Sequence, residues 1–215
     1  MSIPVAIVDY GIGNVSSIRN MFQRLGVLAE ISSDPKVLSS ADRLVLPGVG
    51  AFDTGVNNIR SRDLGGVIRA HALEKKRPLL GICLGMQLLF ERSEEGSEPG
   101  LGLLAGAVRR FPAEPGLRVP HMGWNEIALT GAATLFRARK DDAFGELTRP
   151  LSYYFVHSYY VDPKDPTDVA ATATHGVTFA AAVERGNVYG AQFHPEKSHK
   201  YGMLCLKNFS ETQAC

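Results

Sequence analysis

A cysteine between two glycines is the first residue in this sequence that could do covalent chemistry. Gly81-Ile82-Cys83-Leu84-Gly85 follows a short apolar run and precedes a helical pattern, which places Cys83 at a predicted strand-to-helix junction. This is the spacing of a nucleophile elbow, where the tight turn needs small neighbours. The start of the helix would favour a thiolate, and the backbone N–H of Leu84 would face a developing oxyanion. The alternative is a small buried cysteine that only fills space.

Far downstream, a histidine and a glutamate two residues apart could complete a catalytic triad. The stretch Gln192-Phe193-His194-Pro195-Glu196 ends a strand-like run. Proline restricts His194 to extended backbone, and residues i and i+2 of an extended segment face the same side, so we expect His194 and Glu196 to be presented together. A carboxylate beside an imidazole fixes its tautomer and stabilises the imidazolium. Taken alone, this motif is more often a turn than a catalytic site.

Other residues that could do chemistry have weaker surroundings. Gln87 lies one helical turn after Cys83, where its amide could bind a substrate carboxylate or amide. Cys205 lies in an apolar helical stretch and Cys215 at the chain end, so we interpret them as core and tail. No ligand cluster accompanies the histidines, and the sequence therefore predicts neither a metal site nor a cofactor.

Composition is that of an ordinary globular protein. Hydrophobic residues make up 45% of the chain and charged residues 21%, and the formal net charge is +1 at pH 7. A nearly neutral chain has no global field that would attract nucleic acid or a membrane surface, so neither is expected as a partner. The cysteine spacing suggests no disulfide framework, and no leader or long apolar segment is evident, so we expect a reduced, cytoplasmic protein.

The elements that must position these residues alternate between strand and helix in the first half of the chain. The strand-like runs are 5–9, 27–31, 43–46 and 78–82, and the helical patterns are 14–25, 54–75 and 84–91. A break in the second helical pattern is predicted at Gly65-Gly66. Such alternation predicts a parallel sheet covered on both faces.

The second half consists mostly of strand-like runs joined by turn residues, which predicts antiparallel hairpins added to the sheet. The runs are 107–111, 125–129, 153–161, 169–174, 179–184 and 187–193, with a loop at 93–100 and a closing helix at 200–213. Because no linker or repeat is found, residues 1–215 are expected to form one α/β domain. Its central sheet would be mostly parallel and flanked by helices, with additional antiparallel strands.

Together, Gly81–Gln87 and His194-Pro195-Glu196 resemble the triad class, or class I, of glutamine amidotransferases. Four further stretches are similar to the histidine-biosynthesis branch of that family, and they extend the resemblance over almost the whole chain: Asp9–Asn14, Leu46–Phe52, His121–Asn125 and Tyr154–Tyr159.

This resemblance implies that Cys83 attacks the carboxamide of glutamine, with His194 as base and Glu196 as its orienting acid. Backbone N–H groups of Leu84 and of the Val49-Gly50 region would hold the oxyanion. The residues that the resemblance assigns to glutamine binding are Gln87, Glu95, Gly50, Ser158 and Tyr159. Ammonia would pass to a (β/α)8 cyclase partner.

A partner-facing surface is expected around Trp124, the only tryptophan, which lies beside Met122 in what we interpret as a loop. Aromatic and methionine side chains are enriched at the centres of interfaces. We expect Asn14 and Asn125 to be polar partners beside it. The alternative is that Trp124 simply caps the core.

Glycines on both sides of Val49 make a peptide flip easy, so the oxyanion hole is expected to form fully only with the partner and its ligand bound. Two other interpretations remain open. One keeps the chemistry but changes the acceptor, as in triad amidotransferases that serve anthranilate, GMP or pyridoxal phosphate synthesis. The other is a cysteine peptidase or a redox-sensing protein built on the same elbow.

Overall fold

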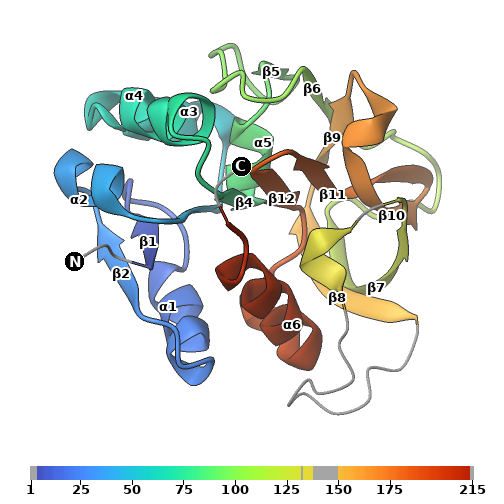
Figure 1. The fold of residues 1–215 in the computed structure, drawn as a ribbon. Helices are drawn as coiled ribbons and strands as arrows, with labels where there is room; N and C mark the ends of the chain where they lie inside the picture. Colours follow the sequence, from blue (N-terminus) through green and yellow to red (C-terminus); the bar gives the residue numbers. More distant parts are fainter. Residues whose placement is uncertain (1–3, 132, 138–149, 214–215) are drawn as a thin grey trace.

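A nine-stranded mixed sheet forms the centre of the molecule and is flanked by helices (Figure 1). The computed structural model describes residues 4–131, 133–137 and 150–213. The strand order is β2-β1-β3-β4-β12-β11-β10-β7-β8. The predicted α/β fold, with antiparallel strands added to a parallel sheet, is confirmed.

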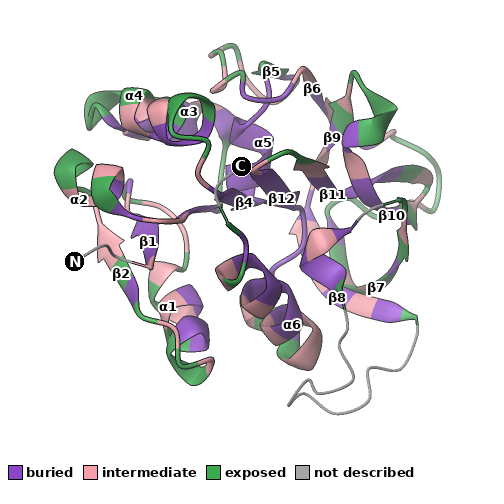
Figure 2. Ribbon diagram, in the orientation of Figure 1, coloured by how far each residue is buried: buried purple, intermediate pink, exposed green. Residues whose placement is uncertain are grey.

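The first half of the main sheet is parallel. Its strands are β1 (Val5–Val8), β2 (Ala29–Ser32), β3 (Leu44–Gly48), β4 (Leu79–Cys83) and β12 (Val188–Ala191). All of these except β2 are buried at every position (Figure 2). Burial on both faces is what parallel strands with covering helices require.

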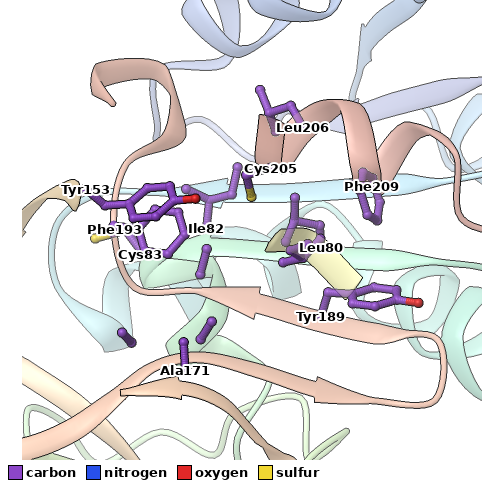
Figure 3. Close-up of a cluster of buried hydrophobic side chains, with 14 of the residues drawn as sticks. Leu80, Ile82, Cys83, Tyr153, Ala171, Tyr189, Phe193, Cys205, Leu206 and Phe209 are labelled. Carbon is purple, nitrogen blue, oxygen red and sulfur yellow. The ribbon is translucent and has the colours of Figure 1, made fainter. Parts of the chain in front are cut away.

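Two core layers sandwich the parallel strands. On one face pack α1 (Val15–Arg24) and α6 (His199–Ser210), and Figure 3 shows Leu206 and Phe209 of α6 in the same buried cluster as Leu80 and Ile82 of β4. The predicted core position of Cys205 is confirmed there, whereas Cys215 lies outside the described residues. The other face carries α2 (Pro35–Ser40), α3 (Phe52–Ser61), α4 (Leu64–Arg69) and α5 (Leu84–Leu88).

The second half of the main sheet is antiparallel. It contains β11 (Val177–Arg185), β10 (Val169–His175), β7 (His121–Leu129) and β8 (Leu151–His157). A smaller sheet of β5 (Arg92–Ser93), β6 (Gly106–Arg110) and β9 (Tyr159–Pro163) lies beside it. No helix within the described ranges has the length and apolar character that a membrane crossing requires.

The predicted break at Gly65-Gly66 is wrong. Both glycines lie inside α4, and the helices part instead at Arg62-Asp63, where Asp63 has a φ of 54°. Aspartate tolerates this left-handed conformation, while a helix tolerates glycine at a modest cost. A π-helical turn, η1 (Ala70–Glu74), completes the predicted helical region.

The segment around Trp124 is a strand and not the predicted loop. Trp124 lies in the middle of β7, opposite Tyr154 of β8. Gly123 and Asn125 suggested a turn, but exposed and less exposed positions alternate along β7, which is the pattern of a strand with one covered face. The predicted single strand at 153–161 is also two strands, β8 and β9, which separate at Ser158 and belong to different sheets.

Candidate active site

The nucleophile elbow predicted at Cys83 is present at the end of β4, where α5 begins. Cys83 has φ 53° and ψ −111°, a conformation that non-glycine residues rarely adopt. The turn is so tight that a Cβ on Gly85 would overlap the carbonyl oxygen of Leu46, and one on Gly81 would lie 2.6 Å from the carbonyl oxygen of Gly85. The glycines therefore permit the strained backbone that places the sulfur at the strand end.

His194 and Glu196 form the predicted pair. Nδ1 of His194 lies 2.7 Å from Oε1 of Glu196, and each side chain is only 3% exposed. The expected extended geometry holds for His194 (φ −100°, ψ 100°) but is wrong for Glu196, which lies in the 3-10 turn η4 (Pro195–Lys197). The turn folds the glutamate back towards the ring that precedes it, so a tight turn makes the contact that we ascribed to alternation along a strand.

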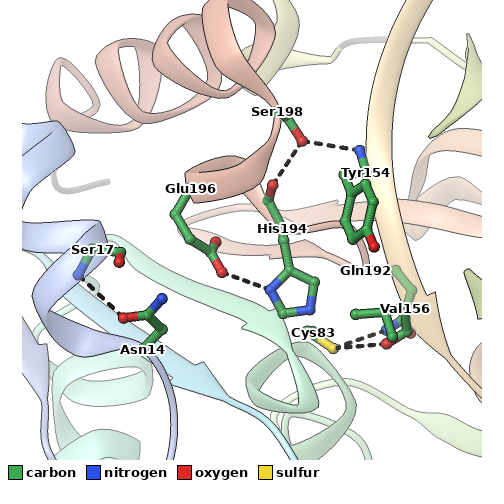
Figure 4. A network of polar contacts seen from close by, with 9 residues as sticks. All are labelled: Asn14, Ser17, Cys83, Tyr154, Val156, Gln192, His194, Glu196 and Ser198. Atoms are coloured by element: carbon green, nitrogen blue, oxygen red, sulfur yellow. Dashed lines mark hydrogen bonds and ion pairs between the residues drawn. The ribbon is translucent and has the colours of Figure 1, made fainter. Parts of the chain in front are cut away.

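The backbone of His194 is fixed to β8. Its N–H donates to the carbonyl of Tyr154 (2.9 Å), and its carbonyl accepts from the hydroxyl of Ser198 (2.6 Å). The same hydroxyl accepts from the N–H of Tyr154 at 3.0 Å (Figure 4). Ser198 therefore ties the turn that carries the histidine to the neighbouring strand.

The electrostatics of His194 favour a charged ring. Burial alone lowers the pKa of His194, but Cys83 and Glu196 outweigh it and raise that pKa from 6.5 to about 10. Nε2 of the ring is buried and has no hydrogen-bond partner among the described residues, and it lies on the side of the ring where Cys83 is found (Figure 4). This nitrogen is free to exchange a proton with the sulfur or with a bound substrate.

A cavity of about 450 Å³ opens over Cys83 and His194. It brings together all the residues predicted to bind glutamine or to form the oxyanion hole, namely Val49, Gly50, Leu84, Gln87, Glu95, Ser158 and Tyr159. Glu196 does not line it, because it lies behind the histidine. The structure thus gathers segments from β3, β4, the 93–98 loop, the β8–β9 junction and η4 around one sulfur atom.

Gln192 is a site residue that sequence reasoning missed. It is fully buried, and its Nε2 lies 3.8 Å from Sγ of Cys83. Its Oε1 accepts from Nε2 of Gln87 (3.2 Å), which also donates to the carbonyl of Tyr159 (3.0 Å). The amide nitrogen of Gln87 is therefore committed to the protein, and its oxygen is left for a ligand. The sequence indicated only that Gln192 and His194, two residues apart in an extended run, would face the same side, and nothing in it placed Gln192 against Cys83.

A second missed feature is a chain of neutral imidazoles that starts at His157 in the cavity wall. Burial, the largest cause, lowers the pKa of His157 to about 3 and that of His121 to about 4. Nδ1 of His157 donates to the carbonyl of Tyr159 (2.8 Å), so its Nε2 must accept from Nδ1 of His121 (3.1 Å). Nε2 of His121 then accepts from the amide of Asn125 (3.1 Å). This chain supports the backbone of Tyr159 at the cavity wall.

The residues expected at a partner interface do not all lie together. Met122 and Trp124 project from the exposed face of β7, where they are 63% and 49% exposed. The Trp124 ring stacks on His199, with centroids 5.5 Å apart. Asn125 alternates to the opposite face of the strand and binds His121 and the carbonyl of Thr174. Asn14 is exposed and caps α1.

This fold and this constellation define a cysteine amidohydrolase of the triad type, and comparison with known proteins gives the family. A family model described as glutamine amidotransferase class-I matches residues 6–211. The chain belongs to this family, and the resemblance predicted from its motifs is confirmed.

The relatives narrow the family further. The chain is 43% identical to "Imidazole glycerol phosphate synthase subunit HisH 2" of Pseudomonas aeruginosa, over 96% of this chain and 98% of that protein. It is 48% identical to "Imidazole glycerol phosphate synthase subunit HisH" of Gloeobacter violaceus, over 98% of this chain and 90% of that protein. The similarity to the histidine-biosynthesis branch is thereby confirmed.

Solved structures agree on the fold. A crystal structure of a glutamine amidotransferase superposes with a TM-score of 0.67 at 20% identity, covering 94% of this chain and 98% of that one. The structure of PurLQS from Thermotoga maritima gives 0.66 at 20% identity, with 97% of this chain and 98% of that one covered.

Proposed function

We propose that this chain is the glutaminase subunit of an imidazole glycerol phosphate synthase, and that it hydrolyses glutamine to supply ammonia to a synthase partner. The observation that carries the proposal is the position of Cys83 on a strained elbow beside His194. The pKa of His194 is raised to about 10, and its Nδ1 contacts Glu196. The names of the HisH relatives support the choice of synthase.

In the first half of the reaction, the sulfur of Cys83 attacks the carboxamide carbon of glutamine and a C–S bond forms. The N–H of Leu84 and one from the Val49-Gly50 segment donate to the oxyanion. His194, held as an imidazolium by Glu196, gives its proton to the departing nitrogen. The C–N bond breaks, ammonia leaves, and a glutamyl thioester remains on Cys83.

In the second half, the now neutral His194 removes a proton from water as the water attacks the thioester. The C–S bond breaks, and glutamate leaves with the oxygen of the water. The sulfur departs as a thiolate, and the proton stays on His194, which restores the starting ion pair. No cofactor or metal is needed in either half.

Substrate recognition is assigned to the walls of the cavity. Glu95 is the one carboxylate among the described residues that line it, so it is the natural partner of the α-ammonium group of glutamine. Gln87, Ser158 and Tyr159 line the same cavity and are assigned to the rest of the ligand. Gly50 has a φ of 102°, and a Cβ there would meet nothing within 4 Å, so it leaves space for the ligand.

For the partner we propose a (β/α)8 cyclase that docks on the exposed face of β7 around Trp124 and Met122. Asn14, which caps α1, remains a predicted contact outside this strand. Asn125, which faces inward, would contribute through the imidazole chain that supports Tyr159. We place the enzyme in the cytoplasm, because a reducing compartment keeps a free thiol such as that of Cys83 available as a nucleophile.

The test is glutamate production by the parent chain, Cys83→Ala and Cys205→Ala, each with and without the cyclase and its nucleotide ligand. We expect Cys83→Ala to lose activity by at least about a thousandfold, as when a triad nucleophile is removed. Cys205→Ala, a matched change in the core, should keep it. If the oxyanion segment completes only on docking, the parent chain alone should be nearly inactive. Glutamate production by Cys83→Ala at the parent rate would end the proposal.

A further inference from the structure

The first turn of α3 shares hydrogen bonds with the loop that carries Glu95. Helix α3 starts at Phe52, directly after the oxyanion segment, and its N-cap residue Ala51 has no side-chain oxygen to accept from the helix. Oε2 of Glu95 takes that role and accepts from the N–H of Phe52 at 2.9 Å. Glu95 is thereby oriented by the helix, and its other oxygen is left for a ligand.

Asp53, the next residue of α3, accepts hydrogen bonds from the same loop. Its Oδ2 accepts from the N–H of Ser97 (3.0 Å) and from the Ser97 hydroxyl (3.4 Å), and its Oδ1 accepts from the N–H of Glu98 (3.0 Å). The backbone bonds from Ser97 and Glu98 lower the pKa of Asp53, so it stays ionised and both oxygens remain acceptors at neutral pH. Thus an N–H of the helix donates to the carboxylate of Glu95 in the loop, while N–H groups of the loop donate to the carboxylate of Asp53 in the helix.

The loop passes Asp53 too closely for a side chain. A Cβ on Gly96 would overlap Oδ1 of Asp53, so a side chain there would push the Asp53 carboxylate away from the loop. On the other side of Glu95, its N–H donates to the hydroxyl of Ser93 (3.1 Å). The backbone on both sides of Glu95 is therefore held by hydrogen bonds. Asp53 itself does not line the cavity.

We propose that Asp53 is a positioning residue for glutamine recognition. It holds the loop at 95–98 against α3, so that the carboxylate of Glu95 meets the α-ammonium group of the substrate. The same helical turn follows Val49–Ala51, so the group that recognises the amino end and the segment that holds the oxyanion are joined through α3. The inference rests on the proposed function in that glutamine is taken as the occupant of the cavity.

The test is calorimetric binding to the full-length chain in a Cys83→Ser background, which does not consume the ligand. Two ligands are compared: L-glutamine, and 4-carbamoylbutanoate, which lacks the amino group. Asp53→Asn removes the charge and turns an amide donor towards backbone N–H groups. We expect the Kd for glutamine to rise roughly tenfold, as when charge-assisted hydrogen bonds are lost, while that for the analogue stays unchanged.

Asp165→Asn is the matched control. Asp165 also accepts a backbone N–H and a hydroxyl, both from Thr167 (2.9 and 2.7 Å), but at a 3-10 turn that does not line the cavity. It should leave both Kd values unchanged. Gly96→Ala should separate the loop from Asp53 without altering the Asp53 side chain itself. It should therefore also raise the Kd for glutamine but not for the analogue, even if Asp53→Asn folds poorly.

Glu95→Gln distinguishes the positioning role of Asp53 from the binding role of Glu95. If Asp53 acts through Glu95, adding Asp53→Asn to Glu95→Gln should change the Kd for glutamine by less than about twofold. Equal weakening of both ligands by Asp53→Asn, or no change in either, would overturn the inference while leaving the function standing. No effect of Glu95→Gln, or no binding of glutamine to the parent chain, would instead count against the proposed function.

Discussion

The parallel and antiparallel halves of the main sheet differ in how their strands are buried and in what they carry. In the parallel half, β1, β3, β4 and β12 are buried along their whole length, and their ends deliver Cys83 and His194. In the antiparallel half, β7 alternates, with His121 and Ile127 buried and Met122 and Trp124 exposed. One half supplies the buried strand ends that carry Cys83 and His194, and the other supplies the cavity wall at the end of β8 and an exposed surface on β7.

The strand order explains why the chemistry belongs to the parallel half. The carboxyl ends of parallel strands meet at one edge of a sheet. Strands β4 and β12 are neighbours with Ile82 opposite Ala191, so the next residues, Cys83 and Gln192, lie side by side. His194 follows two residues later, over the elbow. A sulfur and an imidazole from distant parts of the sequence are placed together by one register.

The largest effect is expected from a methyl group at the elbow. Gly85→Ala would drive a Cβ into the carbonyl oxygen of Leu46 in β3, whereas a Cβ on Gly186, in the β11–β12 turn, would meet nothing within 4 Å. We expect Gly85→Ala to lower the free energy of unfolding by more than about 3 kcal/mol. Gly186 has a φ of 58°, which alanine adopts only at a cost, so Gly186→Ala should lower the free energy of unfolding by about 1 kcal/mol. Urea unfolding of both variants measures the difference, and equal losses would contradict the comparison.

A second prediction concerns the proton on His194. Its pKa of about 10 depends on Cys83 and Glu196, so in Cys83→Ala or Glu196→Gln the opposing effect of burial should lower it by more than one pH unit. Nuclear magnetic resonance titration of the ring reports this directly. His157, whose pKa is lowered to about 3, serves as the internal control and should not titrate between pH 5 and 11.

The sign of the linked stability follows from the raised pKa. A group whose pKa is higher in the folded state stabilises the fold fully below its unfolded value, here 6.5, and loses that contribution as the pH rises through about 10. The parent chain should therefore lose stability between pH 6.5 and 10 more steeply than Glu196→Gln. Parallel pH–stability curves would mean that the imidazolium is not stabilised in the folded state.

The smallest effect is expected on the surface of the antiparallel half. Trp124→Ala should weaken binding of the cyclase by roughly 10- to 30-fold, the range for a central aromatic residue at an interface. Leu28→Ala is the control, since Leu28 is 68% exposed and lies just before β2, at the opposite edge of the sheet. Sedimentation or calorimetry with the partner measures both. An unchanged affinity in Trp124→Ala would place the interface elsewhere.

Local sequence patterns predicted the structure correctly where neighbouring residues alone set the backbone geometry. The glycines around Cys83 predicted the elbow because a tight turn is a property of neighbouring residues. The same reasoning is wrong at Gly65-Gly66 and around Trp124, where glycine predicts a break but the structure has a continuous helix and a continuous strand. Tertiary contacts override local propensity in such places.

The sequence by itself determined the class of fold, and its motifs predicted which cysteine, histidine and glutamate would meet and most of the residues that line the cavity. Only the tertiary structure decided the contact of Gln192 with Cys83, the imidazole chain behind Tyr159 and the return contact of Asp53 with the loop of Glu95. The contacts of Gln192 with Cys83, of His121 with His157 and of Asp53 with Glu98 join residues that are far apart along the chain. Strand order and loop packing set them, and no local spacing of residues encodes such distances.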